Sequence, residues 1–139
     1  SLPMSHELTA LTLAGLLQVS QYVAMSIPAN IELGIGKTIS PRDPARLVKP
    51  LVDQMSQKTG RLYRALNNHF EGLVLFTLAV FVITLSEKSN IVTVSASYIY
   101  LCARVLYVPA YYFGLKPWRT LIWLFGFFAT TTILITALI

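Results

Sequence analysis

The sequence of 139 residues predicts an all-α fold, an integral membrane four-helix bundle with up-down-up-down connectivity and both termini on the non-cytoplasmic side. Hydrophobic residues make up 55% of the chain and charged residues only 12%, whereas a soluble domain carries about 25% charged residues. The mean hydropathy is +0.62. Such a chain has too little polar side-chain surface to cover itself in water, so we expect a membrane protein. Its single cysteine, Cys102, excludes a disulfide within the chain.

Four apolar segments are each long enough to cross a bilayer, which takes about 20 helical residues. We expect a single domain, residues 1–139. Its spans cover about residues 8–37, 61–85, 91–113 and 118–139. The first run is uncharged from residue 8 to residue 31 and no basic residue precedes it, so a span is predicted rather than a signal peptide. Pro28 and Pro109 fall inside the first and third spans, and we expect them to kink or loosen those helices.

The connections between the spans differ in length. Short polar turns are predicted at residues 86–90, between the second and third spans, and at residues 114–119, between the third and fourth. The connection at residues 38–60 is longer, and its three prolines exclude one continuous helix there. A short amphipathic helix over residues 47–55 is expected to lie on the membrane surface.

The basic residues set the expected orientation. Six of them lie between residues 37 and 61, and two more, Lys116 and Arg119, lie in the turn before the fourth span. Lys88 is the basic residue on the opposite side, which makes eight against one. Because basic residues accumulate on the cytoplasmic side of membrane proteins, the loop and this turn are expected to face the cytoplasm. Because the basic residues cluster between apolar runs, they are not expected to form a nucleic-acid-binding face.

The second span carries polar residues along one helical face. Arg61, Arg64, Asn68 and Glu71 follow one another at intervals of three or four residues, which is the spacing of neighbours on a helix surface. Glu71 lies deepest, about 15 Å from Arg61 at about 1.5 Å per residue. A charge at that depth costs several kcal/mol unless a partner or ligand compensates for it, so Glu71 is a candidate functional residue.

The third span carries a matching face, formed by Arg104, Tyr107 and Tyr111 at positions i, i+3 and i+7. Arg104 lies about 14 Å from the end of its span, at nearly the depth of Glu71. We therefore expect a buried ion pair between Glu71 and Arg104, with a hydrogen-bonded pair of Asn68 and Tyr107 beside it. Two interpretations remain open: a structural clamp, or a net cationic cleft that binds an anionic, hydrogen-bonding small ligand.

Two motifs in these spans resemble the MAPEG family, membrane-associated proteins in eicosanoid and glutathione metabolism. Residues 64–71, RALNNHFE, are similar to the family pattern R-A-x-x-N-x-x-E, and residues 104–111, RVLYVPAY, to R-x-x-[YH]-x-x-x-Y. The resemblance extends over nearly all four spans and the basic first loop. It implies a homotrimer of four-helix subunits that binds glutathione between adjacent subunits, in the cytoplasmic half of the membrane.

The resemblance also implies roles for individual residues. The residues implied to bind glutathione are Arg64, Asn68, Glu71, Arg104 and Tyr107. Arg119, at the start of the fourth span, is similar to the arginine that catalytic members place near the glutathione sulfur. Tyr111 or Thr120 would be a second hydrogen-bond donor beside it. Gly72 departs from the family pattern, in which a larger aromatic or polar residue often follows the glutamate.

The implied function is that of a glutathione-dependent transferase or peroxidase. A guanidinium would stabilise the glutathione thiolate for attack on a lipophilic electrophile or hydroperoxide that arrives through the lipid. No metal site is expected, because the sequence lacks a ligand cluster with metal-site spacing. Two alternatives remain open: a small proton-coupled four-helix transporter, and a non-catalytic relative that binds a ligand or scaffolds partners. The expected location is multi-pass in a bacterial inner membrane.

Overall fold

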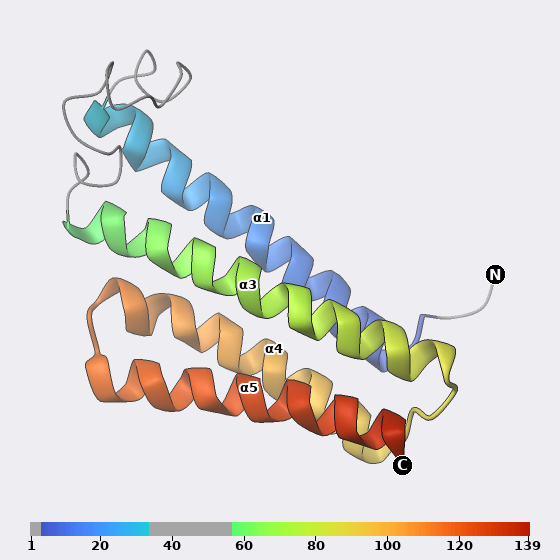
Figure 1. Cartoon of the computed structure of the whole chain (residues 1–139). Coiled ribbons are helices and arrows are strands. Elements are labelled where there is room, and N and C mark those ends of the chain that lie inside the picture. Colours follow the sequence, from blue (N-terminus) through green and yellow to red (C-terminus); the bar gives the residue numbers. More distant parts are fainter. Residues whose placement is uncertain (1–3, 34–56) are drawn as a thin grey trace, which may run out of the picture.

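The computed structural model describes residues 4–33 and 57–139, and this part of the chain forms four long helices without strands (Figure 1). The helices are α1 (His6–Leu33), α3 (Gln57–Leu85), α4 (Ile91–Tyr112) and α5 (Lys116–Leu138). Successive helices run in opposite directions, so the beginning of α1 and the end of α5 lie at the same end of the bundle (Figure 1). The predicted all-α four-helix fold is confirmed.

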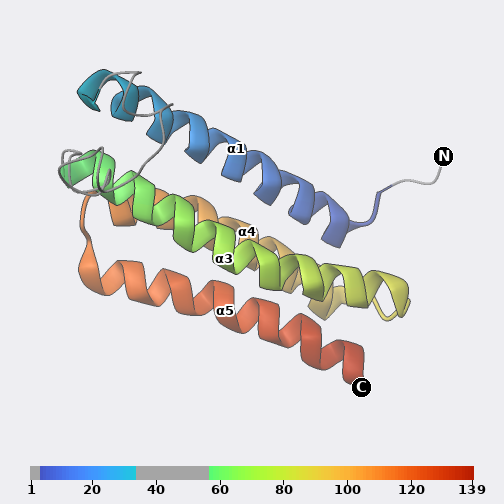
Figure 2. The same cartoon turned by 45° about the horizontal axis from the view of Figure 1, so that its top comes forward.

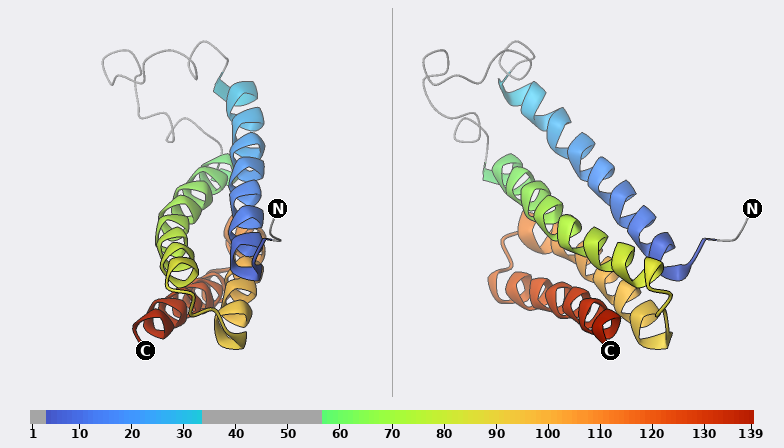
Figure 3. Two further views of the ribbon diagram at one scale, coloured as in Figure 1. Left: turned by 90° about the vertical axis from the view of Figure 1, so that its right-hand side faces the viewer. Right: turned by 45° about the vertical axis from the view of Figure 1, so that its right-hand side comes forward.

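The α3–α4 pair lies in the middle of the bundle. Helix α1 packs against α3 and α4, and α5 packs against the same two helices, with the most extensive contact between α4 and α5. Figure 2 shows α1 and α5 on opposite sides of this central pair, and the two views in Figure 3 show the same arrangement. Small residues such as Ala10, Ala14 and Ala79 are fully buried between the helices, which lets the backbones approach closely.

All four helices are long and apolar enough to cross a membrane. Large apolar side chains such as Leu16, Phe81 and Phe125 point outward from them. Water would make such an outer surface a strong association site, whereas the hydrocarbon of a bilayer solvates it. The chain is therefore an integral membrane protein, and its outer apolar face is suited to contact with lipid.

Helix α3 buries one stripe of residues. Its buried positions include Ala65, His69, Phe76, Ala79 and Ile83, which follow one another at intervals of three, four or seven residues. This is the heptad spacing of a helix that packs along one face. The stripe brings Phe76 against Tyr100 of α4, with the two rings stacked at 3.9 Å. It also places His69 inside the bundle.

Two of the differences between the helix ends and the predicted boundaries concern residues that were predicted to lie in connections. Helix α5 begins at Lys116, inside the segment that the sequence predicted to be a turn, and has Pro117 in its first turn. The prediction was wrong there because proline suits the first helical turn, where no backbone N–H is needed. Helix α3 begins at Gln57, so residues 57–60 belong to a helix and not to the predicted loop.

Other predictions fall outside the described residues. They include the continuation of the first span over residues 34–37, most of the 38–60 loop and its amphipathic helix at residues 47–55.

Helices α1 and α4 continue past Pro28 and Pro109, respectively. Helix α4 begins with a capping box, in which Asn90 accepts from the backbone N–H of Thr93 and Thr93 accepts from that of Asn90.

Candidate functional site

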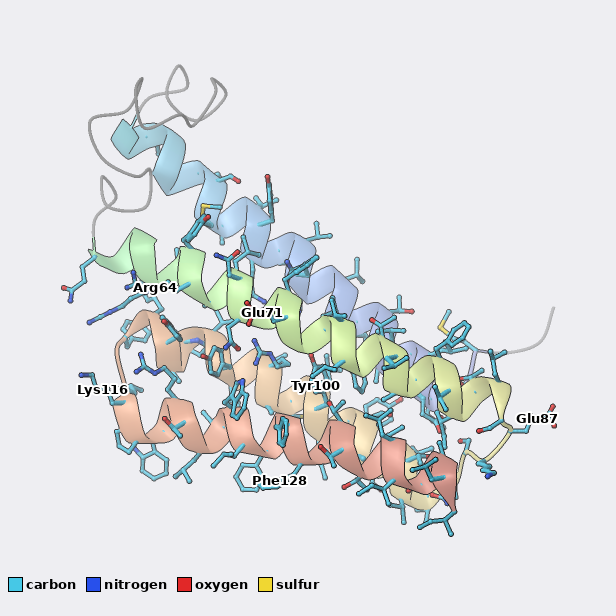
Figure 4. The ribbon with its side chains drawn as sticks, in the orientation of Figure 1. Arg64, Glu71, Glu87, Tyr100, Lys116 and Phe128 are labelled. Carbon is cyan, nitrogen blue, oxygen red and sulfur yellow. The ribbon has the colours of Figure 1, made fainter. Side chains whose placement is uncertain are left out.

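A pocket of about 180 Å³ opens between α3, α4 and α5. It is lined by Asn68, Glu71, Gly72, Leu75, Tyr100, Arg104, Trp123, Gly126, Phe127 and Thr130. Figure 4 shows Glu71 extending from α3 toward α4 and α5, with Tyr100 farther from the end that carries Arg64 and Lys116. We call that end, where α3 begins and α4 meets α5, the basic end. Three predicted site residues, Asn68, Glu71 and Arg104, thus share one pocket.

Arg104 is held inside the bundle by two hydrogen bonds. Its Nε donates to His69 Nδ1 at 3.1 Å, and its Nη1 donates to the side-chain oxygen of Asn68 at 3.1 Å. The guanidinium also lies over the ring of Tyr107, with its carbon 4.5 Å from the ring centre. Only 3% of Arg104 is exposed. In the described part of the chain its remaining N–H groups have no hydrogen-bond partner, so they are available to a ligand.

His69 connects three helices. Because Arg104 donates to its Nδ1, that nitrogen carries no proton, and the proton of the neutral ring is on Nε2. The Nε2–H therefore donates to the backbone carbonyl of Ala14 in α1 at 3.0 Å. The side chain is fully buried. His69 thus fixes the position of Arg104 relative to α1 and α3.

The predicted ion pair between Glu71 and Arg104 is wrong. Among the described residues Glu71 makes no ion pair, and Arg104 is bonded to Asn68 and His69 instead. The predicted pair of Asn68 and Tyr107 is wrong as well: the described residues show no hydrogen bond between them, and the Asn68 oxygen accepts from Arg104. The prediction compared the depths of the residues along the helix axis and not the directions in which their side chains point. Successive side chains point about 100° apart around the axis. His69 therefore points into the bundle, and Glu71 lies at its exposed edge.

Glu71 and Arg64 remain open to ligands. Both side chains are exposed, and neither has a hydrogen-bond or ion-pair partner within residues 4–33 and 57–139. Arg64 lies at the basic end, one turn before Asn68 (Figure 4). Glu71 and the buried cation Arg104 line the same pocket. Positive and negative groups are therefore presented within one short stretch of α3 and α4.

A row of two aromatic rings with a cation at each end continues from the pocket toward the basic end. The Tyr107 and Tyr111 rings lie 5.6 Å apart, and the Arg119 guanidinium carbon lies 4.7 Å from the centre of the Tyr111 ring. Arg104 covers the other side of the row through its contact with Tyr107. The structure thus brings together Tyr111 and Arg119, the two residues that the sequence analysis named as catalytic candidates. Stacking on an aromatic face restrains a guanidinium without neutralising it.

Arg61 has a different position from the one its spacing suggested. It is partly buried, and its Nη1 donates to the backbone carbonyl of Tyr112 at 3.2 Å. Gly114 follows in the α4–α5 turn with φ +69, and the Arg61 guanidinium lies where a side chain at this position would extend. Arg61 therefore ties the start of α3 to the end of α4. Its role in the described part of the chain is structural.

Sequence reasoning missed three residues of this region. His69 lies off the face of Arg64 and Glu71, but its spacing of four residues from Ala65 and seven from Phe76 indicates a buried position. Tyr100 and Trp123 line the pocket but belong to neither motif. Their position depends on how α4 and α5 pack, and no local pattern predicts that packing.

Within the described ranges no group of three or more His, Cys, Asp or Glu residues gathers as a metal site would require.

Comparison with models of protein families finds a match to the MAPEG family over residues 8–139. No curated protein and no solved structure matches the chain significantly. The family match covers all four helices and both sequence motifs. It also covers the whole pocket and the row of aromatic rings and cations beside it.

Proposed function

The chain belongs to the MAPEG family, and we propose that it is a glutathione-dependent membrane enzyme of the transferase or peroxidase type. Glutathione-dependent enzymes are typical of this family. The observation that carries the proposal is the pocket between α3, α4 and α5, in which Glu71 and Arg104 present opposite charges without pairing. A structural clamp would have satisfied both charges within the subunit.

Glutathione complements these groups. It carries carboxylates, an ammonium group, amides and a thiol. Arg64 and the free N–H groups of Arg104 bind carboxylates, because guanidinium groups pair with them through strong, directed hydrogen bonds. Glu71 accepts from the ammonium group. The oxygen of Asn68 is already bound to Arg104, so its NH2 group is the part that faces a ligand.

Arg119 and Tyr111 activate the thiol. A free thiol of this kind has a pKa of about 8.5, so only a small share is thiolate at neutral pH. The charge of Arg119 and the hydroxyl of Tyr111 favour the thiolate, which is the attacking nucleophile. With an aryl halide as acceptor, the sulfur–carbon bond forms and halide leaves. The acceptor reaches the site from the surrounding lipid.

The assembly that we propose is a homotrimer with the basic end in the cytoplasm. Arg64 and Glu71 lie exposed at the edge of the pocket, where a neighbouring subunit would complete a ligand site. The basic end carries Arg61, Lys116 and Arg119, and basic residues favour the cytoplasmic side. Both termini then lie on the non-cytoplasmic side.

The test is glutathione conjugation by the purified protein in detergent micelles, with 1-chloro-2,4-dinitrobenzene as the acceptor and cumene hydroperoxide in a parallel peroxidase assay. Arg119→Ala should lower kcat/KM on the order of 100-fold, the typical effect of removing one charge-stabilising donor. Arg119→Lys should restore part of it. The matched control is Lys116→Ala, an exposed cation in the same helical turn, which should retain activity within about twofold.

Two results would contradict the proposal. One is wild-type protein, folded by circular dichroism, that shows neither conjugation nor peroxidase activity above the uncatalysed rates. The other is activity that Arg119→Ala leaves unchanged. In the first case transport coupled to Glu71, or a non-catalytic binding role, becomes the function to examine.

A further inference from the structure

One hydroxyl in the pocket wall is without a partner. Tyr100 of α4 is only 2% exposed, and its phenol oxygen has no hydrogen-bond partner in the part of the chain that the structure describes. The ring is held in place by stacking on Phe76, with ring centres 3.9 Å apart and planes inclined by 11°. A buried donor left unpaired lowers stability. A fixed, unpaired hydroxyl in a pocket wall is therefore a position where a ligand can contribute the missing acceptor.

Gly72 leaves room beside this hydroxyl. A Cβ atom added to Gly72 would lie 3.4 Å from the Tyr100 oxygen, which is ordinary van der Waals contact. Both residues line the same pocket. Any larger side chain at position 72 would cover the hydroxyl. The glycine in the middle of α3 thus leaves the buried Tyr100 oxygen without a side chain of residue 72 over it.

On the side away from Glu71 and Arg104, the surroundings of Tyr100 are apolar. Leu75, Trp123 and Phe127 form the wall on this side, together with Gly126 and Thr130. The Thr130 hydroxyl donates to the carbonyl of Gly126, so it is used within α5. The groups that bind charge, Asn68, Glu71 and Arg104, lie toward the basic end of the same pocket. Burying a charge against apolar walls is costly, so the Tyr100 end is suited to an uncharged molecule.

We propose that the Tyr100 end of the pocket binds an uncharged, lipophilic molecule and that the Tyr100 hydroxyl donates a hydrogen bond to an oxygen of that molecule, such as a carbonyl. The whole pocket has a volume of about 180 Å³. An apolar cavity of about 150 Å³ holds benzene, so the Tyr100 end of this pocket is suited to a molecule no larger than a small aromatic compound. This molecule is the acceptor substrate of the proposed transferase, so its role as a substrate rests on the proposed function. Tyr100 is then a specificity-determining residue, with Gly72 as the residue that keeps it accessible.

The test compares two probes of nearly the same shape without glutathione. 4'-Fluoroacetophenone carries a carbonyl oxygen, and 4-fluoro-α-methylstyrene carries a CH2 group in its place. Both are titrated into wild-type protein and Tyr100→Phe in micelles, with binding followed by fluorine NMR. Partition into micelles is the same for both proteins, so it cancels when the ratio of the two Kd values is compared between them.

We compare the ratio of the styrene Kd to the ketone Kd in the two proteins. This ratio should be about three- to tenfold larger in the wild type than in Tyr100→Phe, which is the usual effect of one hydrogen bond. Tyr100→Phe should bind the styrene at least as well as the wild type. Gly72→Ala, which keeps the hydroxyl but covers it, should lose the same preference. The matched control is Tyr98→Phe on the same helix, whose hydroxyl contacts His6 at 2.9 Å outside this pocket, and it should keep the wild-type ratio.

Equal Kd ratios in wild type and Tyr100→Phe would overturn the proposal, as would the absence of binding by both probes. A loss of preference in Tyr98→Phe as well would also overturn it, because the effect would then not come from this pocket. None of these results involves glutathione. Failure here and failure of the proposed transferase function are therefore distinguishable.

Discussion

His69 offers the sharpest test of the packing around the pocket. It is fully buried, and it accepts from Arg104 while donating to the Ala14 carbonyl. His69→Phe keeps an aromatic ring of similar size and removes both hydrogen bonds. The neutral bond to Ala14 contributes about 0.6 kcal/mol, the average between membrane helices. The bond from the charged Arg104 contributes about 1.5–3 kcal/mol. The free energy of unfolding should therefore fall by about 2–4 kcal/mol.

The measurement is equilibrium unfolding in mixed micelles with increasing sodium dodecyl sulfate, followed by circular dichroism. The matched control is Asn67→Ala, since Asn67 lies two residues away on the exposed side of α3. It should stay within about 0.5 kcal/mol of the wild type. A His69→Phe variant as stable as this control would refute the reasoning, because His69 would then not hold Arg104 in place.

Three further substitutions test other parts of the structure. Tyr100→Phe should raise the free energy of unfolding of the ligand-free protein by about 1 kcal/mol, because it removes a buried hydroxyl without a partner; a destabilised variant would contradict this. Asn90→Ala should lower the free energy of unfolding by about 1 kcal/mol, since α4 loses its N-cap. Hydrogen exchange should then rise in the first turn of α4 rather than at its end. Gly114→Ala should lower the free energy of unfolding by about 1–2 kcal/mol, because φ is +69 there and a Cβ would lie 2.9 Å from the Arg61 guanidinium. Thermal unfolding of Gly114→Ala at the wild-type temperature would contradict the contact with Arg61.

Hydropathy was sufficient to predict the four helices, because a span needs only a long apolar run and its ends need only polar or capping residues. The boundary errors were local. The sequence predicts a turn at Pro117, although proline is compatible with the first turn of a helix. The sequence predicts a loop over residues 57–60, whereas the structure extends α3 through them.

The interior of the site was harder to predict, since it depends on the rotation of each helix about its axis. Glu71 and Arg104 lie at similar depth, yet Arg104 pairs with His69 and Asn68. The position of His69, seven residues before the buried Phe76, indicates that its side chain points into the bundle. Spacing and family resemblance did predict that Asn68, Glu71 and Arg104 form part of one site, and the pocket contains all three. Tyr100 could not be found from sequence, because its significance comes from Gly72 and Phe76 on another helix.

The most direct test of the central proposal is a calorimetric titration of glutathione into the protein in micelles. Wild type and Glu71→Gln are compared with Glu87→Gln, a matched change of an exposed glutamate at the opposite end of the bundle (Figure 4). The pocket predicts saturable binding to the wild type and to Glu87→Gln, and a Kd at least about tenfold weaker for Glu71→Gln, as expected for a lost charge-assisted hydrogen bond. No binding to folded wild-type protein at millimolar glutathione, or an unchanged Kd in Glu71→Gln, would contradict the assignment of this pocket to glutathione.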